Sequence, residues 1–228
     1  YSYADCFSQH PSVSFPVVVG SNNLSTAIII LGIGVILIFA ASPRYIQFAA
    51  LGGAGIGFIA IFLAAESYRL ERLAIWREPE KYEKGFQTIQ GLYAIGSGGL
   101  FGRGIGNSIQ KLGFVPEAQN DMIFSIICEE MGLTGAIILI LIFALLLWRL
   151  CVISMNCQEL SGAMIAAGIM GHLAIQVILN IAVVTNTIPN TGITLPFISY
   201  GGTSIVFLLG EMGLALNVSR QKNNPPTR

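Results

Sequence analysis

The sequence predicts an all-α protein, a polytopic integral membrane helix bundle with about five spans, and three observations lead to this. Of the 228 residues, 54% are hydrophobic and only 11% are charged, whereas soluble domains carry about 25% charged residues. The mean hydropathy is +0.70. The apolar residues lie in runs of about 20, the length that an α-helix needs to cross a bilayer. This composition excludes a soluble enzyme and a disordered chain, and a net charge of zero without a basic run excludes a nucleic-acid binder.

The spans follow from the runs in which charged residues are absent or rare. Pro43 and Arg44 end the first run, because a proline cannot continue a helix and a cation avoids hydrocarbon. Turn-forming residues between Thr185 and Gly192 separate the last two runs. The five predicted spans are 24–41, 45–65, 122–148, 160–185 and 197–217.

The positive-inside rule orients these spans. If they alternate, Arg44, Arg149 and Arg220 all fall on one side, which is then the cytoplasm. We therefore predict an extracellular loop at 66–121 and a cytoplasmic tail at 218–228, within a single membrane domain that covers 1–228. The first residue is not Met, and the apolar run 13–20 is too short to cross a bilayer. We expect a fragment from the C-terminal part of a longer protein.

A glycine-rich run at 94–108 is the first candidate for chemistry, because it places six glycines in the predicted outer loop. Backbone N–H groups that glycines leave open can form a nest for an anion, and Arg103 and Lys111 would add positive charge. The alternative is a flexible surface loop without a ligand.

Asp121 is the second candidate, because it stands where the outer loop turns into a membrane helix. Asn120 or Asp121 could cap that helix, which would be a purely structural role. A carboxylate at the hydrocarbon boundary is also partly desolvated, and this suits a general base. Asp121, Ser125 and Glu129 are spaced four residues apart and share one helical face.

Two further polar segments lie in the last two predicted spans. His172, Gln176 and Asn180 form a second stripe at helical spacing, and such stripes most often bond to neighbouring helices. The segment 191–204 combines prolines, glycines and hydroxyls, which indicates irregular backbone lining a cavity. Glu211 follows Ser204 by seven residues, on roughly the same helical face.

Five motifs follow one another along the chain between residues 22 and 220. They are Asn23-Leu24-Ser25-Thr26-Ala27, the run from Gly96 to Ser108, Pro116-Glu117-x-x-x-Asp121-x-Ile123-Phe124, Glu129-Glu130-x-Gly132, and the run from Leu195 to Ser204. In this order they resemble the FtsW/RodA/SpoVE family, the membrane proteins of bacterial shape, elongation, division and sporulation. Their details look closer to the division branch than to the elongation branch. Gln119-Asn120 departs from the family, in which many members carry His-Thr before the aspartate.

The resemblance implies a ten-span fold, of which this chain would be the C-terminal half and inactive alone. It also implies a multi-pass peptidoglycan glycosyltransferase that polymerises lipid II at the outer face of the bacterial cytoplasmic membrane. Asp121 would be the catalytic residue, taking the proton from the acceptor's sugar 4-hydroxyl in an inverting reaction on a polyprenyl-diphosphate donor. Arg103 and Lys111 would help neutralise the diphosphate. The remaining candidate substrate-binding residues are Gln87, Glu117, Ser199, Gly201, Gly202 and Ser204.

The resemblance further implies a class B penicillin-binding protein as partner, together with other membrane proteins of the divisome or elongasome. We expect no cofactor and no metal site of the protein's own, and assistance from a divalent cation at the diphosphate stays open. Two other functions compete. A lipid II flippase would need alternating access, often built from inverted repeats, and no internal repeat is visible. A non-enzymatic scaffold would only recruit the penicillin-binding protein.

Overall fold

The computed structural model describes residues 24–41, 67–112, 115–116 and 118–221. In these residues every regular element is a helix, which confirms the all-α prediction. The α-helices are α3 (Leu24–Ala41), α5 (Ser67–Arg77), α6 (Phe86–Gly98), α7 (Ile123–Asn156), α8 (Leu160–Val184) and α9 (Gly202–Gln221). Short 3-10 helices cover Pro79–Lys81, Glu83–Gly85 and Gln110–Leu112.

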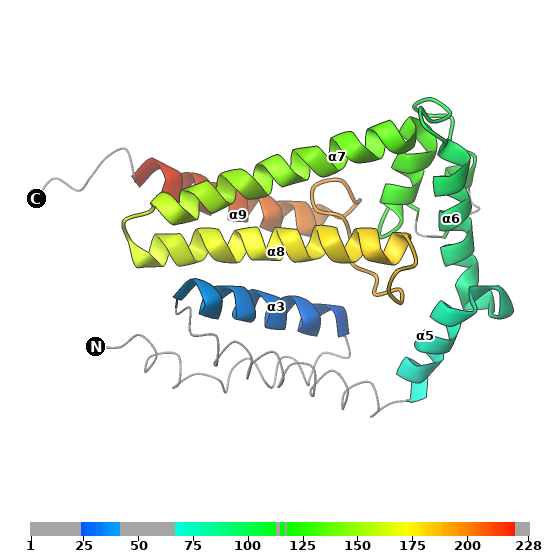
Figure 1. The fold of residues 1–228 in the computed structure, drawn as a ribbon, viewed down its shortest axis with the longest axis horizontal. Helices are drawn as coiled ribbons and strands as arrows, with labels where there is room; N and C mark the ends of the chain where they lie inside the picture. The colour runs from blue at the N-terminus through cyan, green and yellow to red at the C-terminus, as the bar shows by residue number, and fades with distance from the viewer. Residues whose placement is uncertain (1–23, 42–66, 113–114, 117, 222–228) are drawn as a thin grey trace, which may run out of the picture.

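Helix α8 is the centre of the bundle and packs against α3, α7 and α9 (Figure 1). Among the described residues, three helices are long and apolar enough to cross a membrane, namely α7, α8 and the part Gly202–Arg220 of α9. Helix α3 has the predicted bounds and contains a shorter apolar stretch, Ile29–Ile38. The predicted span 45–65 lies outside the described residues.

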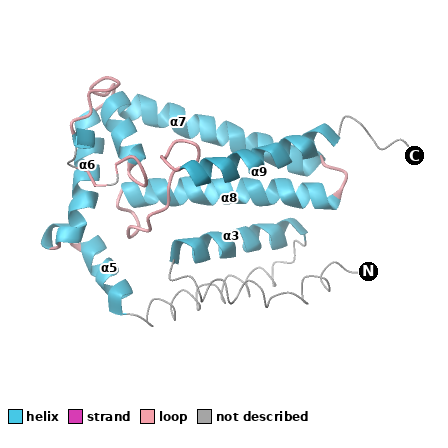
Figure 2. Cartoon of the chain, turned by 180° about the vertical axis from the view of Figure 1, so that it is seen from behind, coloured by secondary structure: helices cyan, strands magenta, loops and turns pink. Residues whose placement is uncertain are grey.

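Helices α5 and α6 lie at one end of this bundle, and α6 crosses it at a steep angle in both views (Figures 1 and 2). They belong to the predicted outer loop, which is therefore largely helical where the structure describes it. Helix α6 packs against the start of α7. The start of α7, the end of α8 and the segment before α9 meet at this same end of the bundle.

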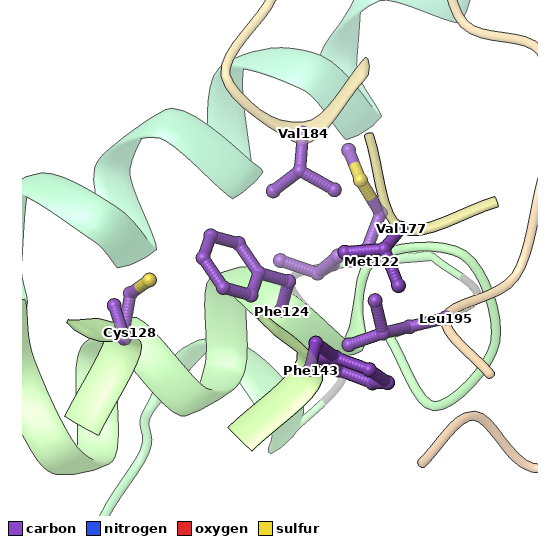
Figure 3. Close-up of a cluster of buried hydrophobic side chains, with 9 residues drawn as sticks. Met122, Phe124, Cys128, Phe143, Val177, Val184 and Leu195 are labelled. Carbon is purple, nitrogen blue, oxygen red and sulfur yellow. The ribbon is translucent and has the colours of Figure 1, made fainter. Parts of the chain in front are cut away.

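A buried apolar cluster holds these three segments together (Figure 3). Met122 and Phe124 come from the start of α7, Val177 and Val184 from α8, and Leu195 from the segment before α9. Met122 and Val184 are 0% exposed, so each contributes about 1.5–3 kcal/mol of burial energy relative to an exposed position. The cluster therefore fixes the backbone on both sides of residue 121.

The bounds of α7 and α9 differ most from the predicted spans. Helix α7 continues past Arg149 to Asn156 and contains one residue, Gly132, with a non-helical conformation at φ +67°. Helix α9 begins at Gly202 instead of residue 197, because the preceding backbone bonds elsewhere. The Tyr200 N–H donates to the Gln119 carbonyl at 2.8 Å, and Phe197 has φ +64°. The expected irregular backbone in this segment is thus confirmed.

Candidate functional site

Asp121 precedes α7 by two residues and does not cap it. The N-cap position is occupied by Met122, and no side chain caps the helix. The prediction that Asn120 or Asp121 is the cap is therefore wrong. A tertiary contact accounts for the difference, because Gln87 on α6 donates from Nε2 to Oδ1 of Asp121 at 3.1 Å. The side chain of Asp121 is buried, with 8% of the residue exposed.

A polar cavity of about 270 Å³ opens beside this carboxylate. Helix α5, helix α6 and the loop that follows α8 form its walls. The side chains that characterise it are Arg72, Trp76, Gln87, Asp121, Asn190 and Thr191. Most of these groups are neutral hydrogen-bonding side chains, as expected where a polar ligand is oriented by a few convergent groups.

Side chains of α5 tie this helix to the loop after α8. Arg72 donates from Nη1 to the Asn190 carbonyl at 3.2 Å, and the Trp76 indole donates to the Asn186 carbonyl at 3.0 Å. Asn190 in turn donates to Oε1 of Gln87 at 3.5 Å. Arg72, Trp76 and Asn190 were not among the predicted site residues. The asparagines and threonines at 185–192 were a usable signal, since the predicted topology places them on the same side of the membrane as the 66–121 loop.

A second layer of bonds fixes the backbone at Asp121. Asn180 is 0% exposed and donates from Nδ2 to the carbonyls of Asp121 at 2.8 Å and Ile193 at 2.7 Å. Ser199 donates from Oγ to the Asn120 carbonyl at 2.6 Å. The expectation that the second polar stripe bonds to neighbouring segments is confirmed for Asn180. It is also confirmed for His172, whose Nδ1 lies 2.9 Å from Oε1 of Glu211 on α9.

The glycine-rich run at 94–108 bridges a break in α7. Gly132 interrupts α7, which would leave backbone groups on both sides of the break unpaired. The run supplies two N–H donors to the first part of the helix and two carbonyl acceptors to the second. The four bonds are Arg103 N to Glu129 O, Gly104 N to Glu130 O, Leu133 N to Gly99 O and Thr134 N to Leu100 O, all at 2.9–3.1 Å.

Close approach at this bridge requires glycine. A Cβ on Gly132 would lie 2.4 Å from the Gly102 nitrogen, and a Cβ on Gly102 would lie 2.1 Å from the Glu130 carbonyl oxygen. Both residues also have positive φ, where other residues are strained. The Glu129-Glu130-x-Gly132 motif and the glycine-rich run at 94–108 thus form one structural joint. This joint fixes the run against α7.

The charges of this joint are mutually paired. The Glu129 carboxylate accepts hydrogen bonds from Ser108 Oγ and from the N–H groups of Ile109 and Gln110. Arg103 lies 3.4 Å from Glu129, and Lys111 lies 2.7 Å from Glu130. The anion that the loop amides bind is therefore a carboxylate of the same chain. Neither cation lines the Asp121 cavity, and their contact with a diphosphate stays a prediction.

The other predicted site residues are placed as follows. Gln87 and Asp121 come together in the cavity, and Ser199 supports the backbone beside them. Gly201, Gly202 and Ser204 stand at the start of α9, outside the cavity lining. Glu117 lies outside the described residues. Within the described ranges, no three His, Cys, Asp or Glu side chains gather as metal ligands.

Residues 9–224 match the family FTSW_RODA_SPOVE, described as cell cycle protein. The chain belongs to the FtsW/RodA/SpoVE family. It is 44% identical over 210 residues to the stage V sporulation protein E of Bacillus subtilis, covering 91% of this chain and 57% of that protein. It is also 44% identical, over 153 residues, to the probable peptidoglycan glycosyltransferase FtsW of the same species, covering 66% of this chain and 38% of FtsW. Identity alone therefore does not separate the sporulation branch from the division branch.

The fold of this family member also matches solved structures. A chain from a structure titled "Structural coordination of polymerization and crosslinking by a peptidoglycan synthase complex" superposes with a TM-score of 0.72 at 27% identity. The match covers 92% of this chain and 60% of that chain. The present chain thus spans about two to three fifths of the length of the two relatives and of the matched chain of the solved structure.

Proposed function

We propose that this chain is the C-terminal part of a peptidoglycan glycosyltransferase and that Asp121 is its general base. The observation that carries the proposal is a buried carboxylate lining a polar cavity where α5, α6 and the loop after α8 meet. Relatives of this chain are named probable peptidoglycan glycosyltransferases. The fold supports the location, because α5, α6 and the loop after α8 all lie at the end of the bundle that the positive-inside rule assigns to the outer face.

In the proposed reaction Asp121 takes the proton from the sugar 4-hydroxyl of the acceptor. The acceptor oxygen attacks the anomeric carbon of the donor and forms the new glycosidic bond. The bond between that carbon and the diphosphate oxygen breaks, and its electron pair leaves with the polyprenyl diphosphate. Attack from the face opposite the leaving group converts an α-linked donor into a β-linked product. Diphosphate is a good leaving group, so no separate general acid is required.

The hydrogen bond from Gln87 suits this role for Asp121. It orients one carboxylate oxygen and keeps the side chain turned toward the cavity instead of toward the N-terminus of α7. Catalytic groups held by other side chains lose less freedom when substrate binds. Asn180 and Ser199 donate hydrogen bonds to the backbone carbonyls of Asp121 and Asn120. The backbone and the side chain of Asp121 are therefore both held.

We further propose that the whole protein is a multi-pass protein of the bacterial cytoplasmic membrane that works with a class B penicillin-binding protein of the divisome or elongasome. A matching structure is titled as a complex that coordinates polymerization and crosslinking. A polymerase alone makes uncrosslinked strands, so a crosslinking partner is the expected complement. A divalent cation at the diphosphate stays an open part of the proposal, and no step above requires it.

The test uses the full-length protein, purified with its penicillin-binding partner whose transpeptidase is blocked, and lipid II as substrate. We expect glycan polymer from the wild type and none from Asp121→Asn, with complex formation unchanged. The matched control is Glu159→Gln, the same change of acid to amide at an exposed position between α7 and α8.

Three outcomes would contradict the proposal. Normal polymer from Asp121→Asn would remove Asp121 as the base. A folded wild type that makes no polymer but moves labelled lipid II across vesicle membranes would indicate the flippase. A wild type that does neither, yet binds its partner, would indicate the scaffold.

A further inference from the structure

We propose that Arg72 is the residue that binds the donor's diphosphate in the Asp121 cavity. The inference rests on the proposed glycosyl transfer and names the cation of that site. It departs from the sequence analysis, which assigned this task to Arg103 and Lys111.

The charges of the reaction require such a group. As the acceptor loses its proton, Asp121 changes from negative to neutral, while the departing diphosphate gains one negative charge. Negative charge therefore moves across the cavity, from the carboxylate to the leaving group. A positive group fixed on the leaving-group side stabilises this transition state more than the ground state.

Arg72 is the one cationic side chain that lines the cavity among the residues that the structure describes. It lies on α5, whereas Asp121 lies at the start of α7, so the two charges come from different walls. Three hydrogen bonds in series join them: Arg72 to the Asn190 carbonyl, the Asn190 amide to Gln87, and Gln87 to Asp121. Neutral amides thus link the cation to the base.

The size of the cavity agrees with this arrangement. At about 270 Å³, it lies near the lower limit of about 300 Å³ for small-molecule sites. Its proposed occupant is therefore only the reacting part of the substrates, with the rest of the glycan and the lipid outside. With the base and the cation on different walls, the acceptor oxygen would meet Asp121 on one side of the anomeric carbon and the diphosphate would meet Arg72 on the other, as inversion requires.

The chemistry of arginine fits the ligand. A planar guanidinium offers paired N–H donors that match two phosphate oxygens, and it stays charged at all relevant pH values. Arg103 and Lys111 are engaged with Glu129 and Glu130 in the joint across α7. Moving either of them to a diphosphate would leave a carboxylate of this joint without its cation.

The test measures binding, so that it does not depend on turnover. The full-length protein carrying Asp121→Asn is placed in nanodiscs, and the affinities for farnesyl diphosphate and for farnesol are measured. Arg72→Gln is added to this background. The matched control is Arg77→Gln, because Arg77 is an exposed arginine at the end of the same helix and outside the cavity lining.

We expect Arg72→Gln to weaken farnesyl diphosphate binding at least about tenfold, since hydrogen bonds between two charged groups are among the strongest in proteins. Farnesol binding should not change, and Arg77→Gln should change neither affinity by more than about twofold. Arg72→Lys should fall between wild type and Arg72→Gln, because it keeps the charge and loses the paired donors. If Arg72→Gln lowers the melting temperature, the affinities of Arg72→Lys test the proposal in its place.

Two results would overturn the proposal. Equal weakening of both ligands would show that Arg72 only ties α5 to the loop after α8, and unchanged diphosphate affinity in Arg72→Gln would exclude the contact. A failure of the proposed function would give a different result. Asp121→Asn would then make polymer, while the affinity for farnesyl diphosphate would still depend on Arg72.

Discussion

Gln87 on α6 donates a hydrogen bond from Nε2 to Oδ1 of Asp121 at 3.1 Å, across 34 residues of sequence. The other end of the same amide accepts a bond from Asn190. Both bonds favour the same orientation of the Gln87 amide, since the carboxylate can accept only from its nitrogen and Asn190 donates to its oxygen. This relationship makes α6 and the loop after α8 parts of the candidate catalytic site.

Gln87→Ala should lower kcat for lipid II polymerisation about tenfold and leave KM within about twofold. Loss of a hydrogen bond to a charged group removes about 1.5 kcal/mol, and here the bond positions the base instead of binding substrate. Gln87→Glu should be worse, because it places a second carboxylate against Asp121. Steady-state kinetics of the full-length complex test this, with Gln90→Ala on the same helix as control. A rise in KM at constant kcat would assign Gln87 to substrate binding.

Glu129→Ala should destabilise the protein strongly. The Glu129 side chain is 1% exposed and accepts bonds from one hydroxyl and two backbone N–H groups, beside Arg103. Removal of one partner from a buried charged network costs about 3–5 kcal/mol, and the exposure of Arg103 places the expected loss at the lower end of this range. Glu129→Gln should lower the stability less, because the amide oxygen can still accept hydrogen bonds. Melting temperatures in detergent measure the difference, and equal temperatures for Glu129→Ala and wild type would contradict it.

Gly132→Ala should prevent correct folding of the joint between α7 and the glycine run. The new Cβ would meet the backbone of Gly102 and Leu100 at 2.4–2.6 Å, at a residue with φ +67°. Backbone atoms on both sides cannot move without breaking the four bonds that bridge α7. The control is Gly96→Ala in α6, where no heavy atom lies within 4 Å of the new Cβ. Gly96→Ala should be neutral or stabilising, so a similar loss of folded protein in both variants would contradict the argument.

The helices were predictable where a single physical requirement acts along one stretch of chain. A span must hide its backbone in about 20 apolar residues, so the prediction for 24–41 matches α3 and that for 160–185 ends one residue beyond α8. The break at Gly132 was not predictable in this way. It is stable only because Gly99 and Leu100, about 30 residues earlier, supply acceptors to the second part of α7.

The candidate site, too, was predictable only where one stretch of chain determines the structure. Asp121 was singled out by its position at a helix boundary, but a local rule predicted a cap, and the contact with Gln87 prevails. Arg72 and Asn190 are 118 residues apart, so nothing in the spacing joins them. Arg103 and Lys111 were predicted to contact a diphosphate, and nothing in their spacing showed that they also pair with Glu129 and Glu130 in the following predicted span.

The hydrogen bond between His172 and Glu211 should stabilise the packing of α8 on α9 without serving the Asp121 cavity. Both residues stand near the middle of their helices, where polar groups are costly unless they are paired. Nδ1 of His172 lies 2.9 and 3.0 Å from the two carboxylate oxygens. Each side chain keeps about a quarter of its surface exposed, at 22% and 27%.

Removal of either partner should therefore cost more than removal of both. We expect His172→Leu or Glu211→Leu alone to lower the free energy of unfolding by about 1–3 kcal/mol, because each leaves a polar group without its partner in the membrane. The double variant should be more stable than either single variant, since no unpaired group remains. Melting temperatures of the four proteins in one detergent form a double-mutant cycle that measures this coupling. Strictly additive losses would show that the two side chains do not stabilise each other.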